Sequence, residues 1–183
     1  KSKTKHYRYK KPGNPYRLFP NLLIAGLPAY APMQYIASDM TAFYFKGTYY
    51  ELTLYMDLWN NEIVSHALSS RRGDRMTYIN GLEGLIRNKD KETEWQTILH
   101  TDQGAVYASK KYNDILKLNH MAHSMSRAGT PTDNAAMEAI NGWLKAELFT
   151  DFHVTGKASV EQEIEEYIKF FHEKRPAYAL GYM

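Results

Sequence analysis

Several features that would mark particular classes of protein are missing from this sequence. Its 183 residues include no cysteine, which excludes disulfides, thiolate zinc sites and cysteine nucleophiles and favours a reducing compartment. No apolar run approaches the roughly 18 residues that a membrane-spanning helix needs, so a membrane-spanning protein is excluded. The chain starts at Lys1 without an apolar signal segment. We therefore expect a piece of a longer protein that stays in the cytoplasm.

Acidic residues are also missing from the first 38 positions, where basic residues are frequent. This stretch contains seven Lys and Arg, whereas the remaining 145 residues contain 16 Lys and Arg and 20 Asp and Glu. Prolines and glycines interrupt any periodicity there, which predicts a basic arm or linker over 1–32 and a core domain over 33–183. A basic arm suits a polyanion such as DNA, because each neutralised phosphate releases counterions, and Lys10 and Lys11 are candidate DNA contacts. A solvated terminus without a binding role is the alternative.

Beyond the arm, the side-chain pattern predicts three strands followed by alternating helices and strands. Aromatic and β-branched side chains are concentrated in residues 35–45, 49–58 and 63–69. The turn pairs Lys46-Gly47 and Asn60-Asn61 between them predict an antiparallel meander. The elements expected after the meander are a helix at 74–87, a strand at 97–101, a helix at 109–118, a strand at 120–124, and helices at 133–149 and from 159 onward. This order predicts an α/β fold with a mixed five-stranded sheet, three strands antiparallel and then two parallel, flanked by helices.

The start and the buried face of the last helix can be read from its spacing. Ser159 and Gln162 have the spacing of a capping box. Apolar side chains then recur on one helical face, which we expect to pack on the domain. They are Val160, Ile164, Tyr167, Ile168 and Phe171.

Three acids lie at positions in this layout where they could converge. Asp39 lies within the first predicted strand, Asp102 at the end of the fourth, and Glu138 near the start of the helix after the fifth. The first and fourth strands could lie side by side, with that helix across their ends. Three carboxylates from separate elements favour Mg²⁺ or Mn²⁺, and two such ions about 3.5–4 Å apart support phosphoryl transfer. Spacing alone also allows three unrelated surface acids, because the chain has 20 acids in all.

The residues around these acids form five ordered blocks that resemble a known family. The blocks are Ser38–Thr41, Met56–Val64, His100–Tyr107, Ser124–Glu138, and a closing segment of Lys174–Pro176 and Ala179–Tyr182. Over roughly residues 33–182, the chain resembles the integrase-type catalytic core of bacterial insertion-sequence transposases, the group closest to retroviral integrases. Five blocks with matching gaps are far more specific than any one of them.

The resemblance implies a ribonuclease-H-like fold and a DDE-type transposase/integrase core. Asp39, Asp102 and Glu138 match the family triad, in which the first Asp bridges two Mg²⁺ (or Mn²⁺) ions and the other two acids each hold one. The implied reaction is metal-assisted phosphoryl transfer on DNA, in which water cleaves at the transposon end and the freed 3′-hydroxyl attacks another phosphodiester. It proceeds without a covalent enzyme intermediate. A catalytically inert DNA-binding or assembly module derived from such a transposase is the alternative function.

The resemblance also implies partners. The partner is DNA, both transposon ends and target, bound by a homodimer or a higher synaptic assembly at the bacterial nucleoid. The helix-turn-helix region with which the family recognises transposon ends is not part of this sequence. In the closing motif the family usually has a histidine and a small polar residue where this chain has Ala177 and Tyr178, and His172 replaces a common asparagine.

Three more basic residues are candidate DNA contacts. Lys145 follows Glu138 by two helical turns and corresponds to a family lysine placed at the DNA end. Arg127 precedes the helix that carries Glu138 and could contact a phosphate, and Arg175 lies in the closing motif. A salt bridge or a solvated side chain is the alternative for Lys145, and a loop anchor is the alternative for Arg127.

Asp57, another acid on a predicted strand, and three of the seven histidines are given structural interpretations or left open. Asp57 precedes a turn, which favours a structural role. His120 and His123 lie on one predicted strand and face opposite sides, so they do not chelate a metal together. His100 either orients Asp102 or the substrate, or packs as an ordinary strand histidine.

Overall fold

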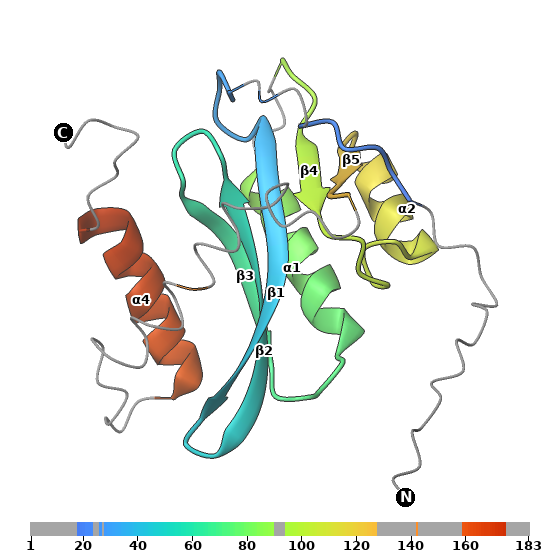
Figure 1. Cartoon of the computed structure of the whole chain (residues 1–183). Helices are drawn as coiled ribbons and strands as arrows, with labels where there is room; N and C mark the ends of the chain where they lie inside the picture. The colour runs from blue at the N-terminus through green and yellow to red at the C-terminus, as the bar shows by residue number, and fades with distance from the viewer. Residues whose placement is uncertain are drawn as a thin grey trace, which may run out of the picture.

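The structure is a computed structural model that describes residues 18–23, 26, 28–89, 94–127, 142 and 159–174. Its elements, in chain order, are β1 (Tyr35–Phe45), β2 (Thr48–Asp57), β3 (Ile63–Ser69), α1 (Arg75–Asn88), β4 (Ile98–Thr101), α2 (Lys110–Leu118), β5 (Ala122–Met125) and α4 (Val160–Lys174) (Figure 1). Apart from residue 142, the helix predicted at 133–149 lies outside the described residues. In the described part of the chain, no helix combines the length and apolar character needed to cross a membrane.

The five strands form one sheet in the order β3-β2-β1-β4-β5. β1 pairs with β2, and β2 with β3, in antiparallel ladders, whereas β4 pairs in parallel with both β1 and β5. The β1–β2 hairpin turns at Lys46 and Gly47, whose φ angles of 47° and 79° are the left-handed pair that a tight hairpin requires. The predicted mixed sheet, with three antiparallel strands and then two parallel ones, is confirmed.

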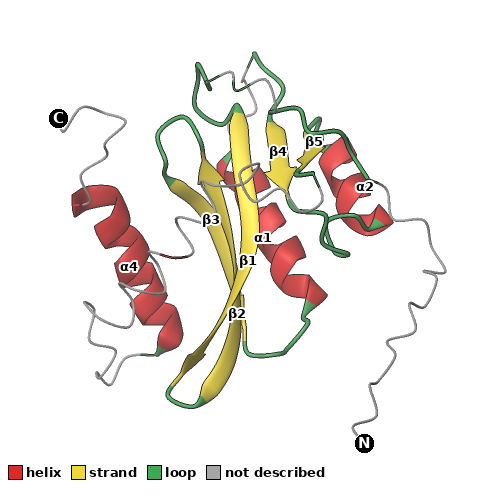
Figure 2. Ribbon diagram, in the orientation of Figure 1, coloured by secondary structure: helices red, strands yellow, loops and turns green. Residues whose placement is uncertain are grey.

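Helices cover both faces of this sheet (Figure 2). Side chains alternate along β1, so Ile36 faces α1 and α2 while Ala37 faces α4. Each face has its own hydrophobic core, and the apolar residues predicted for α4 all lie in the core on the α4 side of the sheet. The first core includes Ile36, Tyr55, Leu82, Leu85, Leu99, Tyr107, Tyr112 and Leu116, and the second includes Leu52, Leu54, Met56, Val160, Ile164, Tyr167, Ile168 and Phe171. Both β1 and β4 are interior strands of this sheet, each with a neighbouring strand on both sides.

Side-chain caps determine where two of the helices start. Asp74 accepts a hydrogen bond from the Met76 amide (3.0 Å) and begins α1, as its position predicts. Ser159 Oγ accepts from the Gln162 amide (3.3 Å), and Gln162 Oε1 accepts from the Ser159 amide (3.1 Å). This reciprocal pair confirms the capping box predicted for α4.

The prediction that His120 lies on a strand is wrong. β5 begins at Ala122, and His120 precedes it in a left-handed conformation with φ of 54°. The His120 amide donates to the Lys117 carbonyl (3.1 Å), so this residue terminates α2 instead of extending a strand. His123 does lie on β5, where its ring is paired with Thr101 and Asn113. The two histidines therefore do not share a site.

Candidate metal centre

Two of the three predicted metal-binding acids follow the parallel ladder between β1 and β4. β1 and β4 run side by side in parallel, with Ala37 opposite His100 as the last pair of their ladder (Figure 1). Asp39 and Asp102 each lie two residues beyond this pair, the first still on β1 and the second just after β4. Because neighbouring strands are about 4.8 Å apart, the two acid-bearing segments leave the ladder next to each other. Asp39 is half-buried on β1, and Asp102 is exposed just after β4.

The electrostatics of a nearby tyrosine agree with this placement. The Tyr78 hydroxyl, on α1, has a pKa raised to about 12, first by burial and then by the negative charge of Asp102, with a further contribution from Asp39. The Asp39 charge also contributes to the raised pKa of Tyr107, after burial and the neighbouring Tyr55. Both carboxylates therefore act on Tyr78, which places both of them within electrostatic range of α1.

The Asp102 carboxylate is held by the turn that follows β4. The Gly104 amide donates to Asp102 Oδ1 at 2.8 Å, and Thr101 Oγ1 donates to the Asp102 carbonyl at 2.8 Å. A Cβ atom on Gly104 would lie only 2.8 Å from Asp102 Oδ1, so the carboxylate and the amide approach closely because residue 104 is glycine. Gln103 extends the turn to the neighbouring segment by donating from Nε2 to the Ser126 carbonyl (3.0 Å).

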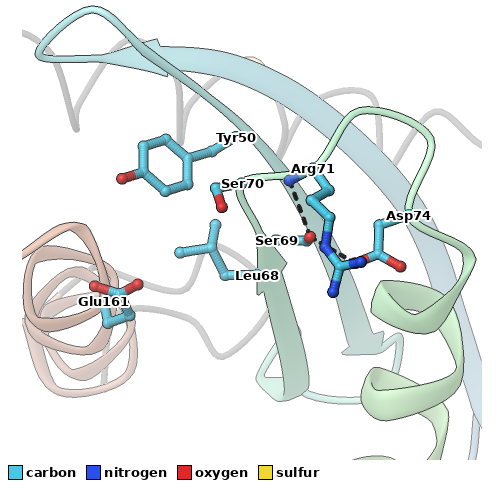
Figure 3. A pocket seen from close by; sticks show the side chains of 7 residues that line it. All are labelled: Tyr50, Leu68, Ser69, Ser70, Arg71, Asp74 and Glu161. Carbon is cyan, nitrogen blue, oxygen red and sulfur yellow. Dashed lines mark hydrogen bonds between the residues drawn. The ribbon is translucent and has the colours of Figure 1, made fainter.

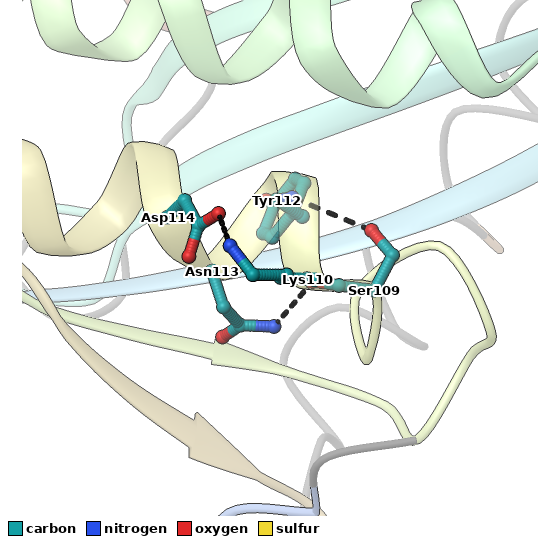
Figure 4. Close-up of polar contacts among 5 residues, drawn as sticks. All are labelled: Ser109, Lys110, Tyr112, Asn113 and Asp114. Atoms are coloured by element: carbon teal, nitrogen blue, oxygen red, sulfur yellow. Dashed lines mark hydrogen bonds and ion pairs between the residues drawn. The ribbon is translucent and has the colours of Figure 1, made fainter. Parts of the chain in front are cut away.

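The start of α2 anchors the other end of this turn. Ser109 Oγ accepts from the Tyr112 amide (3.4 Å), and Asn113 Nδ2 donates to the Ser109 carbonyl (2.9 Å) (Figure 4). Lys110 and Asp114 form an ion pair on the exposed side of the helix. The segment that carries Asp102 is thus fixed at one end by the sheet and at the other by a capped helix.

A tyrosine that the sequence analysis did not single out lies directly behind the two acids. Tyr107 is fully buried, and its hydroxyl is 3.1 Å from Oγ of Ser38, the residue before Asp39. Its ring packs edge-on against the rings of Tyr78 and Tyr112, at 5.0 and 5.3 Å between centroids. In the sequence, Tyr107 stands out only as the last residue of the His100–Tyr107 block, and spacing alone does not assign a role to a buried tyrosine.

His100 is a buried link between β4 and β5. Its Nδ1 is 2.8 Å from Ser124 Oγ and its Nε2 is 3.1 Å from Ser126 Oγ. On β5, burial and the neighbouring His100 lower the pKa of His123 to about 4, so His123 is neutral at physiological pH. Of the two roles left open for His100, this geometry favours the packed strand histidine.

Asp57 has the structural role that the sequence predicts. It is buried, its Oδ2 accepts from the Met33 amide (2.7 Å), and its Oδ1 accepts from the Trp59 amide (3.0 Å). Burial raises the pKa of this carboxyl, and the two amides oppose the shift. The acid therefore ties the β2–β3 turn to the segment before β1.

The other predicted site residues are mostly outside the part of the chain that the structure describes. Glu138, Lys145, Lys10, Lys11 and Arg175 all lie outside it. Within it, no group of three or more histidine, aspartate or glutamate side chains is arranged to hold a metal. The described residues thus supply two members of the proposed triad.

Arg127 is the one predicted DNA contact within the described ranges. It is exposed and follows Ser126, whose amide donates to the Thr101 carbonyl (2.9 Å) immediately before Asp102. Arg127 therefore lies two residues after the end of β5, and β5 is the neighbour of β4 in the sheet.

A cavity of about 330 Å³ lies elsewhere, between the end of the β2–β3 ladder and α4 (Figure 3). It is lined by Tyr50, Leu68, Ser69, Ser70, Arg71, Asp74 and Glu161. None of the predicted site residues lines it, and its walls carry charges of both signs. The cavity is therefore separate from the paired carboxylates.

Comparison with known proteins gives consistent matches. Two family models described as integrase core domain match residues 29–131 and 119–183. The transposase for insertion sequence element IS904 of Lactococcus lactis is 34% identical over 99% of this chain and 70% of its own length. The putative transposase InsK for insertion sequence element IS150 of Escherichia coli is 31% identical over 94% of this chain. This chain spans only 60% of InsK.

Solved structures of viral integrases share the fold. An integrase catalytic core domain of HTLV-2 in complex with magnesium aligns with a TM-score of 0.64 and 16% identity, over 80% of this chain and 90% of that one. A simian T-cell lymphotropic virus intasome aligns with a TM-score of 0.71 and 19% identity, over 88% of this chain and 55% of that one. The fold is therefore the ribonuclease-H-like fold of the retroviral integrase cores.

Proposed function

Because the chain belongs to the integrase core domain family of insertion-sequence transposases, we propose that it cleaves DNA at transposon ends and transfers the cleaved strands. The observation that supports the proposal is the parallel β1–β4 ladder, whose last pair lies two residues before both Asp39 and Asp102. Two carboxylates carried by adjacent parallel strands, one within β1 and one just after β4, are a suitable basis for a phosphoryl-transfer site.

The proposed site consists of Asp39, Asp102 and Glu138. The donor set fits Mg²⁺ or Mn²⁺, because carboxylate oxygens are the ligands these ions prefer and the Asp102 side chain is open to solvent. When bound, two such ions would supply Lewis-acid stabilisation of the attacking and leaving oxygens. Asp39 contributes a carboxylate on a rigid central strand, and the Gly104 amide orients the carboxylate of Asp102.

DNA is the proposed substrate, with phosphate contacts from basic residues around the site. Arg127, Lys145 and Arg175 are the candidates in the core, and Lys10 and Lys11 in an arm over 1–32 that precedes a core of 33–183. Each neutralised phosphate releases counterions, so every such contact increases affinity at low salt. The proposed assembly is a dimer or higher synaptic complex at the bacterial nucleoid, which is supported by the intasome and the dimeric HTLV-2 core among the structural neighbours.

A branched DNA that mimics the joined product tests this chemistry in reverse. Phosphoryl transfer is reversible, and a preformed branch removes the need for the separate region that recognises transposon ends. We expect resolution of the branch with Mg²⁺ or Mn²⁺, and a loss of at least ~100-fold in rate for Asp102→Asn, the scale associated with losing a transition-state contact. Asp114→Asn is the matched control, because Asp114 is an aspartate on the outer side of α2 that pairs with Lys110.

The two functions considered for this chain predict different results. A catalytic core gives metal-dependent resolution that Asp102→Asn abolishes and Asp114→Asn retains. An inert DNA-binding module binds the branch and never resolves it, with either metal. Equal rates for the wild type and Asp102→Asn would also contradict the proposed site.

A further inference from the structure

We propose that Tyr107 is a positioning residue that sets the separation of the Asp39 and Asp102 carboxylates. The inference rests on the proposed function, since it gives those two acids a shared metal site. It concerns a side chain that is fully buried. Tyr107 acts through the two short segments that carry the acids.

The first link is to the strand that carries Asp39. The Tyr107 hydroxyl and Ser38 Oγ are 3.1 Å apart, and both residues are buried. The backbone ladder between β1 and β4 ends at the pair of Ala37 and His100, one residue before Ser38. The hydroxyl pair therefore joins β1 to the chain after β4 just beyond the last ladder pair, next to Asp39.

The second link is to the turn that carries Asp102. A Cβ on Gly104 would lie 3.4 Å from Cδ2 of Tyr107 and 2.8 Å from Asp102 Oδ1, so the ring and the carboxylate both approach the same glycine. The Gly104 amide holds that carboxylate oxygen at 2.8 Å. The Ala108 amide donates back to the Gly104 carbonyl (2.9 Å), which closes the turn around Tyr107. The Tyr107 side chain thus bonds to one acid-bearing segment through its hydroxyl and lies close to the other with its ring.

The ring can transmit position because it is held rigidly. Tyr78 and Tyr112 pack edge-on against it at 5.0 and 5.3 Å between centroids. Asn113 Nδ2 donates to the Tyr107 carbonyl at 2.8 Å and fixes the backbone. Burial raises the pKa of the Tyr107 hydroxyl well above its usual value, so it stays protonated and keeps its hydrogen bond. A change at the hydroxyl is therefore passed to Ser38 instead of being absorbed by ring motion.

Tyr112 provides a matched control for a purely structural role. It is as deeply buried as Tyr107, and its hydroxyl makes an equivalent bond to the Tyr55 hydroxyl (2.9 Å). Tyr112 lies on α2, and its hydroxyl bonds to Tyr55, which in turn has a side-chain hydrogen bond to Ser38, so Tyr112 reaches Ser38 only through a second residue. If both tyrosines only stabilise the core, removing either hydroxyl has the same consequences.

The test is a Mn²⁺ titration of the whole 183-residue chain, read as the rise in melting temperature. Tyr107→Phe removes only the hydroxyl, and Ser38→Ala breaks the same bond from the other side. We expect each to raise the half-saturating Mn²⁺ concentration at least fivefold, and the double variant to be no worse than either single one. Tyr112→Phe should lower the melting temperature of the metal-free protein by a similar amount and leave the half-saturating concentration unchanged.

The outcomes separate this inference from the proposed function. If the wild type responds to Mn²⁺ and Asp102→Asn does not, the metal site stands, and Tyr107→Phe then decides the inference. Equal half-saturating concentrations for the wild type, Tyr107→Phe and Ser38→Ala would overturn it, as would an equal shift in Tyr112→Phe. If Tyr107→Phe does not fold, Ser38→Ala alone gives the answer. A wild type without any Mn²⁺ response would instead refute the proposed site itself.

Discussion

Gly104→Ala tests whether the turn after β4 positions the Asp102 carboxylate. The added methyl would lie 2.8 Å from Asp102 Oδ1 and 3.4 Å from the Tyr107 ring. Gly104 does not have a left-handed φ, so alanine introduces a collision without backbone strain. Because the ring is buried, the exposed carboxylate is the group that must move. The carboxylate then loses its 2.8 Å bond to the residue 104 amide.

Displacing the carboxylate should change both the free energy of unfolding and the affinity for metal. The lost hydrogen bond lies at an exposed carboxylate that water can solvate, so we expect a cost of about 1 kcal/mol in the free energy of unfolding, or roughly 2–4 °C in melting temperature. The effect on metal binding should be larger, because disturbing a group that orients a ligand typically costs about 10–100-fold in metal affinity. A small stability loss combined with a large affinity loss is the expected signature.

Mn²⁺ titrations by calorimetry, with melting curves of the metal-free proteins, measure both quantities. Gly84→Ala is the control, because its Cβ would lie 2.4 Å from the Ser65 hydroxyl, where α1 faces the edge strand β3, away from β1 and β4. Moving that hydroxyl breaks its buried 2.7 Å bond to the Gly81 carbonyl, so stability should fall by about 1–3 kcal/mol. The affinity for Mn²⁺ should not change, because the collision is remote from the candidate site. The reasoning is refuted if Gly104→Ala binds Mn²⁺ as tightly as the wild type.

Three further predictions concern the stability of the fold. Burial and the neighbouring His100 lower the pKa of His123 to about 4, below about 6.5 in the unfolded chain, so the unfolded state binds more protons between these values. The contribution of His123 to the free energy of unfolding should therefore be complete above about pH 6.5 and fall by about 3 kcal/mol towards pH 4, as measured by urea unfolding. The His123→Gln variant should give a flatter pH profile, and a profile unchanged from that of the wild type would contradict this. Ser159→Ala removes the side chain that accepts from the Gln162 amide and should cost about 1 kcal/mol by urea unfolding, whereas no loss would show that α4 needs no cap. Leu54→Ala empties a fully buried position between β2 and α4 and should cost about 2–5 kcal/mol, and a loss below 1 kcal/mol would mean that this core is loosely packed.

The sheet and its helix caps could be predicted from sequence because their signals are local. The Lys46-Gly47 turn, the Asp74 cap and the Ser159 capping box each depend on residues within a few positions of one another. Alternation along each strand then assigns its faces. His120 was misplaced because a left-handed residue after a helix can be mistaken for the start of the next strand.

The candidate site was predictable only in part, because it depends on contacts that are remote in sequence. The resemblance selected Asp39 and Asp102, and the pairing of β1 with β4 brings the segments that carry them together. Tyr107 and its bond to Ser38 span 69 positions, and nothing local distinguishes this tyrosine from the other 14 in the chain. The bonds from His100 to Ser124 and Ser126 were hidden for the same reason, since only the pairing of β4 with β5 brings them together.

The most direct test of the account is a crystal structure of the whole chain grown with Mn²⁺ and measured at a wavelength where manganese scatters anomalously. The account predicts two anomalous peaks about 3.5–4 Å apart. The Asp39 carboxylate should lie between them, with Asp102 on one ion and Glu138 on the other. Ions bound elsewhere, or a Glu138 side chain on a different surface from Asp39 and Asp102, would contradict it.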